Sequence, residues 1–245
     1  MLQNPKEVKD NIVKWIKDYF DNTAKNAKVV IGISGGKDSY VVAALCKEAL
    51  GVDRVVGILL PNGEQADIND SLEIATSLGI EYHIINIRKM YDAMVEQLNL
   101  TCSEISTQTM VNIAPRLRMT SLYAYAASIK EGARVVNTCN RSEDYIGYST
   151  KYGDAAGDFS PLQELLVSEV RQVGNELGLL DKYINKAPSD GLCGKTDEDN
   201  LGFTYAELEE YICKGTSGSE EKDKIIKYKH IANLHKLELM PHFSL

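Results

Sequence analysis

The chain alternates short apolar runs with segments of helical apolar spacing, and this alternation limits its fold more than any other feature. Runs rich in Val and Ile are typical of strands buried on both faces, and they cover residues 28–33, 54–60, 81–87 and 134–137. Helical spacing is found over residues 8–19, 40–50, 66–78, 90–98 and 115–131. Because strands that alternate with helices form βαβ units, we predict an α/β fold with a parallel sheet covered on both faces.

The predicted topology also indicates where a ligand binds. Right-handed crossovers bring the carboxyl ends of all strands to one edge of the sheet, and open α/β sheets bind ligands there. Beyond residue 140 the pattern loosens into loops at residues 151–158 and 187–200, with helices expected over 161–177, 204–214 and 220–233. We find no internal repeat and no convincing domain boundary, so we expect one domain over residues 1–245.

The composition excludes several classes of protein. The 35 acidic and 27 basic side chains give a net charge of -8, which argues against a nucleic-acid-binding surface. The N-terminus is polar, and no apolar run is long enough to span a bilayer, so we expect neither a secretory signal nor a membrane segment. The five cysteines are odd in number and lack a Cys-x-x-Cys pair, which favours reduced thiols in a cytoplasmic protein.

The most informative segment follows the first predicted strand and reads Ile31-Gly32-Ile33-Ser34-Gly35-Gly36-Lys37-Asp38-Ser39. Paired glycines allow a tight turn, and the helix that follows adds its N-terminal N–H groups, so the segment predicts an anion site sized for a diphosphate. It is neither a Walker A loop nor a Gly-x-Gly-x-x-Gly motif. Asp38 would repel phosphate unless Mg²⁺ lies between them; the alternative is a simple turn in which Asp38 caps the helix.

The Ser-Gly-Gly-x-Asp-Ser pattern of this segment resembles the loop of the ATP-pyrophosphatase superfamily. The resemblance implies a Rossmann-like, adenine nucleotide alpha hydrolase-like fold and cleavage of ATP between the α- and β-phosphates, with formation of an adenylate. It also implies ATP-binding residues, which are Gly32, Ile33, Ser34, Gly35, Gly36, Lys37, Asp38 and Ser39. Lys37 stands where relatives often carry an uncharged residue.

Three further segments resemble one member family of that superfamily, the NAD synthetases. They are Arg116-Leu117-Arg118-Met119-Thr120-Ser121-Leu122-Tyr123, Asn137-Thr138-Cys139-Asn140-Arg141-Ser142-Glu143, and the loop Gly147-Tyr148-Ser149-Thr150-Lys151-Tyr152-Gly153-Asp154 with Asp158 beyond it. The resemblance implies that Thr138 binds ATP and that Glu143 is a second Mg²⁺ ligand beside Asp38. It implies deamido-NAD contacts for Arg118, Tyr123, Lys151 and Asp158, with Lys151 also catalytic. For Tyr123, packing in the core explains the residue equally well.

The resemblance continues toward the C-terminus, with one departure. Pro188-Ser189-Asp190-Gly191-Leu192 and Thr196-Asp197-Glu198 resemble a mobile loop over ATP, with Ser189 as an ATP ligand. His235 and Lys236 match a His-Lys pair that contacts deamido-NAD. Where the family has a lysine that contacts ATP phosphate, this chain has Val167. Lys37 or another cation then compensates, or nucleotide binding is weaker.

The activity implied by the resemblance is an ATP-dependent amidation. The enzyme would be a C–N ligase that converts deamido-NAD to NAD through an acyl-adenylate, releasing AMP and pyrophosphate. The length leaves no room for a glutaminase domain, so we expect free ammonia as the nitrogen donor, unless a separate amidase subunit delivers it. The resemblance also implies a homodimer. The alternatives are another amidotransferase or a tRNA-modifying enzyme of the superfamily, for which paired cysteines and a basic surface are lacking, or a catalytically silent homologue, which Val167 favours.

Overall fold

The fold is built on a parallel sheet of four described strands. The computed structural model describes residues 1–65, 68–186 and 197–244. The strands lie in the order β3-β2-β1-β4 and are β1 (Lys28–Gly32), β2 (Val55–Leu59), β3 (Glu81–Ile84) and β4 (Ala133–Val135). All three pairings are parallel, and Val30 of β1 is in register with Val56 of β2 and Val135 of β4. The predicted parallel α/β fold is therefore confirmed.

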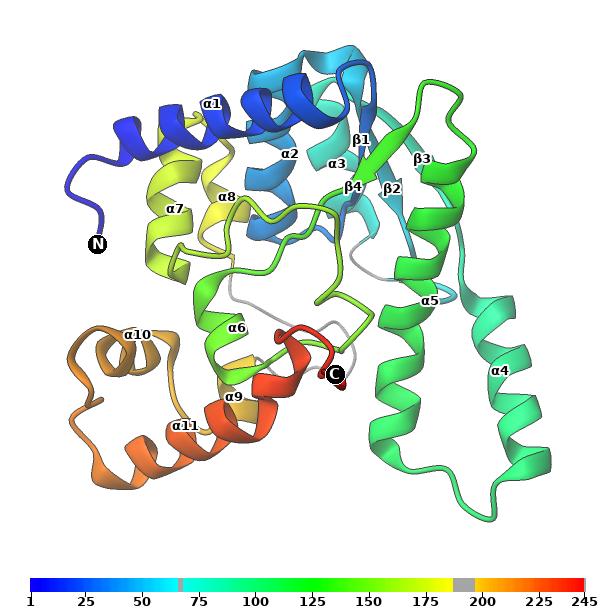
Figure 1. Cartoon of the computed structure of the whole chain (residues 1–245), viewed down its shortest axis with the longest axis vertical. Helices are drawn as coiled ribbons and strands as arrows, with labels where there is room; N and C mark the ends of the chain where they lie inside the picture. Colours follow the sequence, from blue (N-terminus) through cyan, green and yellow to red (C-terminus); the bar gives the residue numbers. More distant parts are fainter. Residues whose placement is uncertain (66–67, 187–196, 245) are drawn as a thin grey trace.

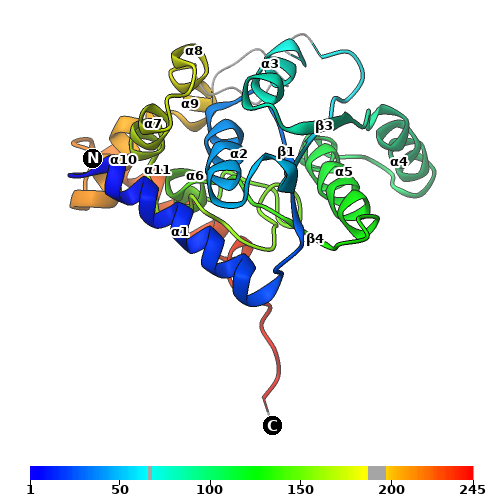
Figure 2. The ribbon, with the colours of Figure 1, turned by 90° about the horizontal axis from the view of Figure 1, so that it is seen from above.

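Helices cover both faces of this sheet (Figures 1 and 2). One face carries α1 (Pro5–Thr23), α2 (Lys37–Leu50), α3 (Ile68–Leu78), α7 (Val167–Glu176) and α8 (Asp181–Ile184); the other is covered by α5 (Thr107–Ala127). Side chains of β1 alternate accordingly. Val29 and Ile31 join the apolar cluster of the first group, whereas Val30 packs in the cluster with α5. Burial on both faces explains why β1 and β2 read as continuous apolar runs, whereas every residue of the edge strand β3 is exposed, so the predicted burial of that strand was wrong.

Helix α4 (Arg88–Thr101) lies at the margin of this core, against which its partly buried Tyr91 packs. It lies beside α5, and the two helices project beyond the sheet (Figure 1). None of its residues is buried, although its sequence has apolar groups at helical spacing. The helix therefore leaves an apolar stripe on the surface.

The C-terminal part of the chain packs around a third apolar cluster. It comprises α6 (Arg141–Ile146), α9 (Asp197–Leu201), α10 (Tyr205–Lys214) and α11 (Glu220–Asn233). Ile146, Leu201, Leu208 and Ile226 meet in this cluster with the first residue of α7, Val167. Short 3₁₀ turns η1 (Val52–Arg54) and η2 (Leu234–Lys236) complete the described elements.

Several predicted boundaries were wrong. The helix predicted over 115–131 begins at Thr107, because Ser106 caps its start by accepting the Thr109 N–H. Pro115 therefore lies inside the helix and not at its start. The strand predicted over 81–87 ends at Ile84. The helix predicted over 161–177 begins at Val167, where Glu169 accepts the Leu166 N–H at 3.0 Å. Part of the loop predicted over 187–200 is helix α9.

The strand order determines where the functional site lies. The chain runs from β1 outward to β2 and β3, and then returns to place β4 on the opposite side of β1. The carboxyl ends of β1 and β4 therefore flank a topological switch point, where open α/β sheets bind ligands. The loops that follow these two strands are the phosphate-loop segment and residues 137–140.

Candidate functional site

A cavity of about 420 Å³ opens at this switch point. Its walls come from the loop after β1, the loop after β4, the start of α3 and the middle of α5. The lining includes eleven residues predicted from the sequence, namely Gly32, Ile33, Ser34, Gly35, Gly36, Lys37, Asp38, Ser39, Arg118, Thr138 and Glu143. Residues that lie about one hundred positions apart in the sequence thus line one cavity, as the predicted topology requires.

The loop between β1 and α2 has the geometry of an anion site. Gly35 adopts φ +82°, a conformation that glycine adopts without steric cost. Gly36 is the N-cap of α2, so the first N–H groups of a 14-residue helix face the loop. The Ser34 and Ser39 hydroxyls lie 3.2 Å apart, and Gly36 N donates to Ser34 Oγ. Asp38 lies in the first turn of α2 and is not its cap, so the alternative role for this residue is wrong.

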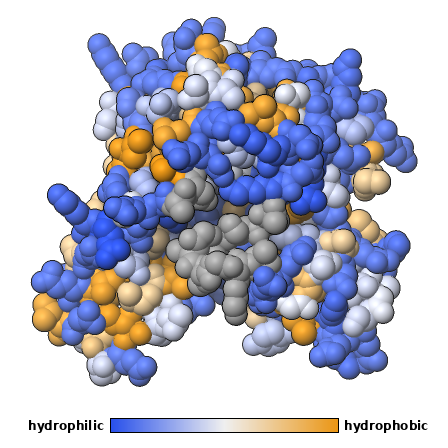
Figure 3. Space-filling view, turned by 180° about the vertical axis from the view of Figure 1, so that it is seen from behind, coloured by the Kyte–Doolittle hydropathy of each residue, from blue (hydrophilic) through white to orange (hydrophobic). Residues whose placement is uncertain are grey.

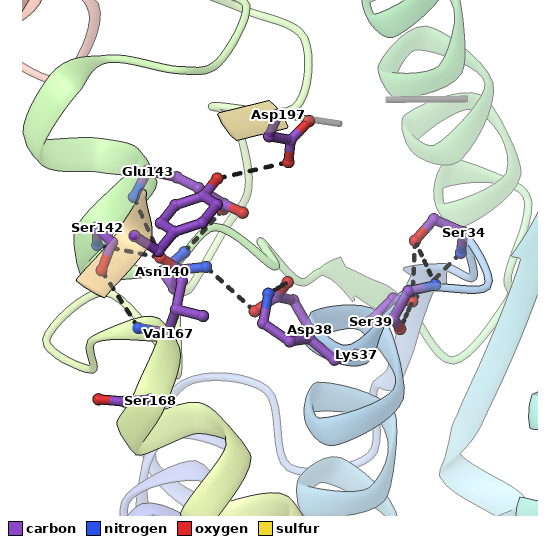
Figure 4. A network of polar contacts seen from close by, with 12 residues as sticks. Ser34, Lys37, Asp38, Ser39, Asn140, Ser142, Glu143, Val167, Ser168 and Asp197 are labelled. Atoms are coloured by element: carbon purple, nitrogen blue, oxygen red, sulfur yellow. Dashed lines mark hydrogen bonds and ion pairs between the residues drawn. The ribbon is translucent and has the colours of Figure 1, made fainter. Parts of the chain in front are cut away.

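Two carboxylates from separate strand ends meet through one asparagine (Figure 4). Asn140 Nδ2 donates to Asp38 Oδ1 at 3.2 Å, and Asn140 N donates to Glu143 Oε2 at 3.3 Å. Asn140 is fully buried and is the N-cap of α6, where its Oδ1 accepts the N–H groups of Ser142 and Glu143. The short helix α6 and its capping box therefore hold Glu143 beside the end of β1.

The electrostatics of this pair are unfavourable without a cation. Burial raises the pKa of Glu143 well above the usual range, and the neighbouring Asp38 carboxylate raises it further. Lys37, whose side chain is 4% exposed, lies with its Nζ 2.7 Å from Asp38 Oδ2. Burial alone would lower the pKa of Lys37, but the Asp38 and Glu143 carboxylates outweigh it and raise the pKa. The protein thus places one lysine against two carboxylates.

The donor set fits a magnesium ion that also binds phosphate. Mg²⁺ in nucleotide sites takes one or two carboxylates and completes its shell with phosphate oxygens and water. Asp38 and Glu143 supply two carboxylates in the cavity that also contains the phosphate loop. Over the described ranges, no group of three or more His, Cys, Asp or Glu side chains is placed to hold a metal ion, so phosphate oxygens and water would have to complete the shell. The residues fit a cation that arrives together with a nucleotide.

Val167 cannot make the phosphate contact that a lysine makes at this position in the family. Its side chain is 2% exposed and packs in the third apolar cluster, while its N–H donates to Ser142 Oγ at 3.2 Å. Of the described residues that line the cavity, the lysines and arginines are Lys37, Arg118 and Lys186. Lys37 is the one on the phosphate loop.

The residues predicted to bind deamido-NAD divide into two places. Arg118 lines the cavity and donates to Leu60 O at 3.0 Å, and burial lowers its pKa. The others are not in the lining of the cavity but contact one another or their neighbours. Tyr123 Oη donates to Asp158 Oδ1 at 3.2 Å, and Lys151 Nζ donates to His235 O at 2.6 Å.

The remaining predicted residues that the structure describes are not in the lining of the cavity. Lys236 Nζ donates to the carbonyls of Gly147 and Ser149, at 2.6 and 2.9 Å. These bonds tie the C-terminal His-Lys pair to the loop that carries Lys151. Tyr123 is 38% exposed, so the core-packing alternative for this residue is wrong. Ser189 lies outside the described residues.

Sequence reasoning missed several residues of the site. Asn140 was part of a quoted motif but was given no role, although Asn-x-x-Glu is the sequence signature of a capping box. Asp197 was assigned to a loop, yet it is 7% exposed, lines the cavity and lies within hydrogen-bond distance of Tyr148 Oη and Tyr205 Oη. Ser71 also lines the cavity from α3. Asp197 was included only in the resemblance to a loop over ATP, and no local pattern marked Ser71, because only the tertiary fold brings it to the cavity.

The fold and the cavity together define a class of protein. A parallel sheet with a glycine-bent loop and paired carboxylates at its switch point is the arrangement of the ATP-pyrophosphatase enzymes, which use ATP to form an adenylate of their substrate. Comparison with known proteins specifies the family. The family model described as NAD synthase matches residues 8–242. The chain belongs to the NAD synthase family.

Individual relatives agree with this assignment. The NH(3)-dependent NAD(+) synthetase of Pyrococcus horikoshii is 39% identical over 219 residues, which are 89% of this chain and 83% of that protein. The NMN synthetase structure from Francisella tularensis has a TM-score of 0.89 at 35% identity and covers 98% of this chain and 99% of that one. An NH3-dependent NAD synthetase from Campylobacter jejuni, in complex with nitrate, has a TM-score of 0.80 at 27% identity, with 98% and 99% covered.

Family membership confirms the predicted class of enzyme. As a member of the NAD synthase family, the chain is an ATP-dependent ligase that forms a C–N bond in the synthesis of NAD. The two alternatives outside this family, another amidotransferase and a tRNA-modifying enzyme of the superfamily, were therefore wrong. No described helix has the length and apolar character to cross a bilayer.

Proposed function

We propose that the phosphate-loop residues Gly32 to Ser39, with Thr138 and Ser189, bind ATP. The chain adenylates its substrate at this binding site. The left-handed Gly35, the N-terminus of α2 and the Ser34 and Ser39 hydroxyls support a site for the leaving pyrophosphate. Lys37, buried on the same loop, is the cation for these phosphates. Lys37 supplies the positive charge that Val167 cannot supply, because Val167 is an apolar residue buried among apolar side chains.

Asp38 and Glu143 are the proposed magnesium ligands. The observation that carries this proposal is the convergence of the two carboxylates on Asn140 in the cavity that the phosphate loop lines. The raised pKa of Glu143 supports it, because a divalent cation would relieve the repulsion between two neighbouring carboxylates. When bound, Mg²⁺ neutralises charge on the phosphate oxygens of ATP.

The reaction then proceeds in two displacements. The nicotinate carboxylate attacks the α-phosphorus, a new O–P bond forms, and the bond to the bridging oxygen of pyrophosphate breaks. Ammonia attacks the carbonyl carbon of the acyl-adenylate, a C–N bond forms, and AMP leaves as a proton is lost. The loop N–H groups and Lys37 hold charge that develops on the leaving pyrophosphate.

The deamido-NAD site is proposed to comprise Arg118, Tyr123, Lys151, Asp158, His235 and Lys236, with Lys151 also acting in catalysis. Arg118 lines the ATP cavity, so it is the residue that joins the two substrate sites. The hydrogen bonds Tyr123–Asp158 and Lys151–His235 define two clusters outside the cavity, and the dinucleotide would contact both. Both clusters contain groups suited to phosphate and ribose hydroxyls.

We also propose that the chain forms a homodimer. The α4–α5 pair supports this assembly, because it leaves exposed apolar side chains at Met90, Met94, Leu100 and Val111, which are 38%, 44%, 75% and 40% exposed. Seen from behind, hydrophobic side chains gather over this projecting pair (Figure 3). Exposed apolar patches of this kind are typical of protein interfaces. A sedimentation-velocity measurement showing a monomer at micromolar concentration would contradict the dimer.

Three further features belong to the same proposal. The chain acts as a single synthetase domain that uses free ammonia, it works in the cytoplasm, and it has no nucleic-acid partner. The net charge of -8 supports the last point.

Nicotinate mononucleotide is a second candidate substrate. The Francisella NMN synthetase has a higher TM-score against this chain than the Campylobacter NAD synthetase, 0.89 against 0.80. Both substrates present the same nicotinate carboxylate, so the adenylation step would be unchanged. The two differ in the adenylate half, which only the dinucleotide carries.

A pyrophosphate-release assay tests the proposal. With ATP, Mg²⁺ and ammonium present, kcat/KM is measured for deamido-NAD and for nicotinate mononucleotide. We expect turnover of deamido-NAD, and Asp38→Ala should abolish it. Preference for the mononucleotide would establish the second candidate, turnover of neither would refute both, and substantial activity of Asp38→Ala would refute the magnesium role.

A further inference from the structure

Ser71 is a buried hydroxyl without a partner beside the phosphate loop. It lies in the first turn of α3, its side chain is 1% exposed, and its Oγ has no hydrogen-bond partner among the described residues. A buried polar group in this condition is uncommon and destabilising, and it calls for an explanation. Because Ser71 lines the cavity at the switch point, a ligand can supply the missing partner.

The position of Ser71 relative to the loop specifies which part of a ligand it meets. A Cβ placed on Gly35 would come within 3.2 Å of Ser71 Oγ and 3.5 Å of Ser71 N. Ser71 therefore lies against the left-handed turn of the loop. The N-terminal turn of the 11-residue helix α3 faces the same turn, and helix N-termini favour anions.

One charge near Ser71 opposes an anion, and the structure neutralises it. Asp70 precedes Ser71 in the helix, and its carboxylate would repel phosphate. Lys186 Nζ lies 2.6 Å from Asp70 Oδ2, so the local charge is balanced. Lys186 also lines the cavity. The surroundings of Ser71 are thus compatible with a phosphate group.

We propose that the Ser71 hydroxyl donates a hydrogen bond to the pyrophosphate part of ATP and so forms, with α3, a second wall of the phosphate site. This inference rests on the proposed role of the phosphate loop and adds a residue from a different element. It assigns Ser71 to ATP binding and to the retention of the leaving group. A hydrogen bond from a hydroxyl to a charged oxygen is stronger than one between neutral groups.

Ser71→Ala gives this proposal a signature that a structural role would not give. Removing an unsatisfied buried hydroxyl leaves the melting temperature of the ligand-free protein unchanged or higher. Calorimetric titration should show about tenfold weaker binding of ATP with Mg²⁺, and of inorganic pyrophosphate with Mg²⁺, in line with the loss of one hydrogen bond to a charged group. Binding of AMP, which lacks the two leaving phosphates, should not change.

The matched control is Ser77→Ala on the same helix. Ser77 Oγ donates to Ile74 O at 2.8 Å, away from the cavity, so this variant should keep wild-type affinity for ATP and pyrophosphate. Unchanged pyrophosphate affinity in Ser71→Ala, or a lowered melting temperature with unchanged ATP affinity, would overturn the proposal. Gly35→Ala separates the two levels of inference. If that variant loses ATP binding while Ser71→Ala does not, only the role of Ser71 fails; if the wild-type chain binds neither ligand, the loop assignment fails as well.

Discussion

The side-chain amide of Asn140 donates a hydrogen bond to Asp38 Oδ1 at 3.2 Å, across a separation of 102 residues. The same side chain caps α6 through its oxygen, which accepts the N–H groups of Ser142 and Glu143. One buried asparagine thus orients an acidic residue of the phosphate loop and begins the helix that carries the second acidic residue. The two proposed metal ligands are positioned together by this residue.

Asn140→Ser separates the two roles of this residue. Serine is a good helix N-cap, so the free energy of unfolding should fall by no more than about 1 kcal/mol, but it cannot donate to Asp38 in the same way. We expect the magnesium concentration for half-maximal pyrophosphate release to rise about tenfold, the effect of one lost hydrogen bond to a charged group. The measurement is a Mg²⁺ titration alongside urea unfolding. Unchanged magnesium dependence would show that Asn140 acts only as a cap.

Gly35→Ala tests the turn of the phosphate loop. Alanine at φ +82° is strained, and its Cβ would lie 3.2 Å from Ser71 Oγ and from Asp70 Cβ. We expect a loss of about 1–2 kcal/mol in the free energy of unfolding and at least tenfold weaker ATP binding, because the loop must shift. Gly51→Ala is the control. Gly51 has φ +89° at the other end of α2 with nothing within 4 Å of a Cβ, so it should lose stability and keep ATP affinity.

The phosphate loop and its surroundings were predicted from the sequence to different extents. The loop was predictable because everything that defines it is local, namely a strand, two glycines and a helix start within nine residues. The meeting of β1 and β4 followed from parallel topology. Contacts such as Lys151 with His235, 84 residues apart, were not predictable, because no periodicity encodes which loop a C-terminal turn will touch. The family resemblance supplied those residues, but not their partners.

The helices show where local patterns failed. Helix α4 has apolar residues at helical spacing, and that pattern predicts burial, yet no residue of α4 is buried. Spacing reports which face of a helix is apolar and not what covers it. Helix α9 was missed because Asp197, Glu198 and Asp199 read as a polar loop, although acidic residues are favourable in the first turn of a helix.

Lys37→Met tests whether the loop lysine serves the nucleotide phosphates. Methionine preserves most of the buried volume and removes the charge that lies 2.7 Å from Asp38 Oδ2. We expect ATP affinity to fall about tenfold or more, because a charged donor to phosphate is lost. Equilibrium binding of ATP measures this directly. Lys47→Met, in the last turn of the same helix, is the control and should bind ATP like the wild-type chain. Equal affinities of Lys37→Met and wild type would leave the phosphates to Lys186 and the loop N–H groups.

Asp144→Asn tests a pH dependence of stability. Burial, and then the Asp154 carboxylate, raise the pKa of Asp144 from 3.8 to about 6, and its Oδ1 is buried without a partner over the described ranges. The native state therefore holds this proton more tightly than the unfolded state does. Stability should fall as pH rises from about 4 to about 6 and should stay lower above that range. Because the group is partly exposed, we expect this fall to amount to about 1–2 kcal/mol.

In Asp144→Asn this fall should disappear, so the variant should match the wild-type chain at pH 4 and exceed it by about 1 kcal/mol at pH 7.5. Urea unfolding at four pH values between 4 and 7.5 measures the difference. Asp223 offers a control of opposite sign, because hydrogen bonds from Ser217 lower its pKa. Asp223→Asn should be less stable than wild type at neutral pH and should approach it as the pH falls below 4. If Asp144→Asn loses as much stability between pH 4 and 6 as the wild-type chain, then another carboxyl group causes the slope, and the first to test would be Glu143.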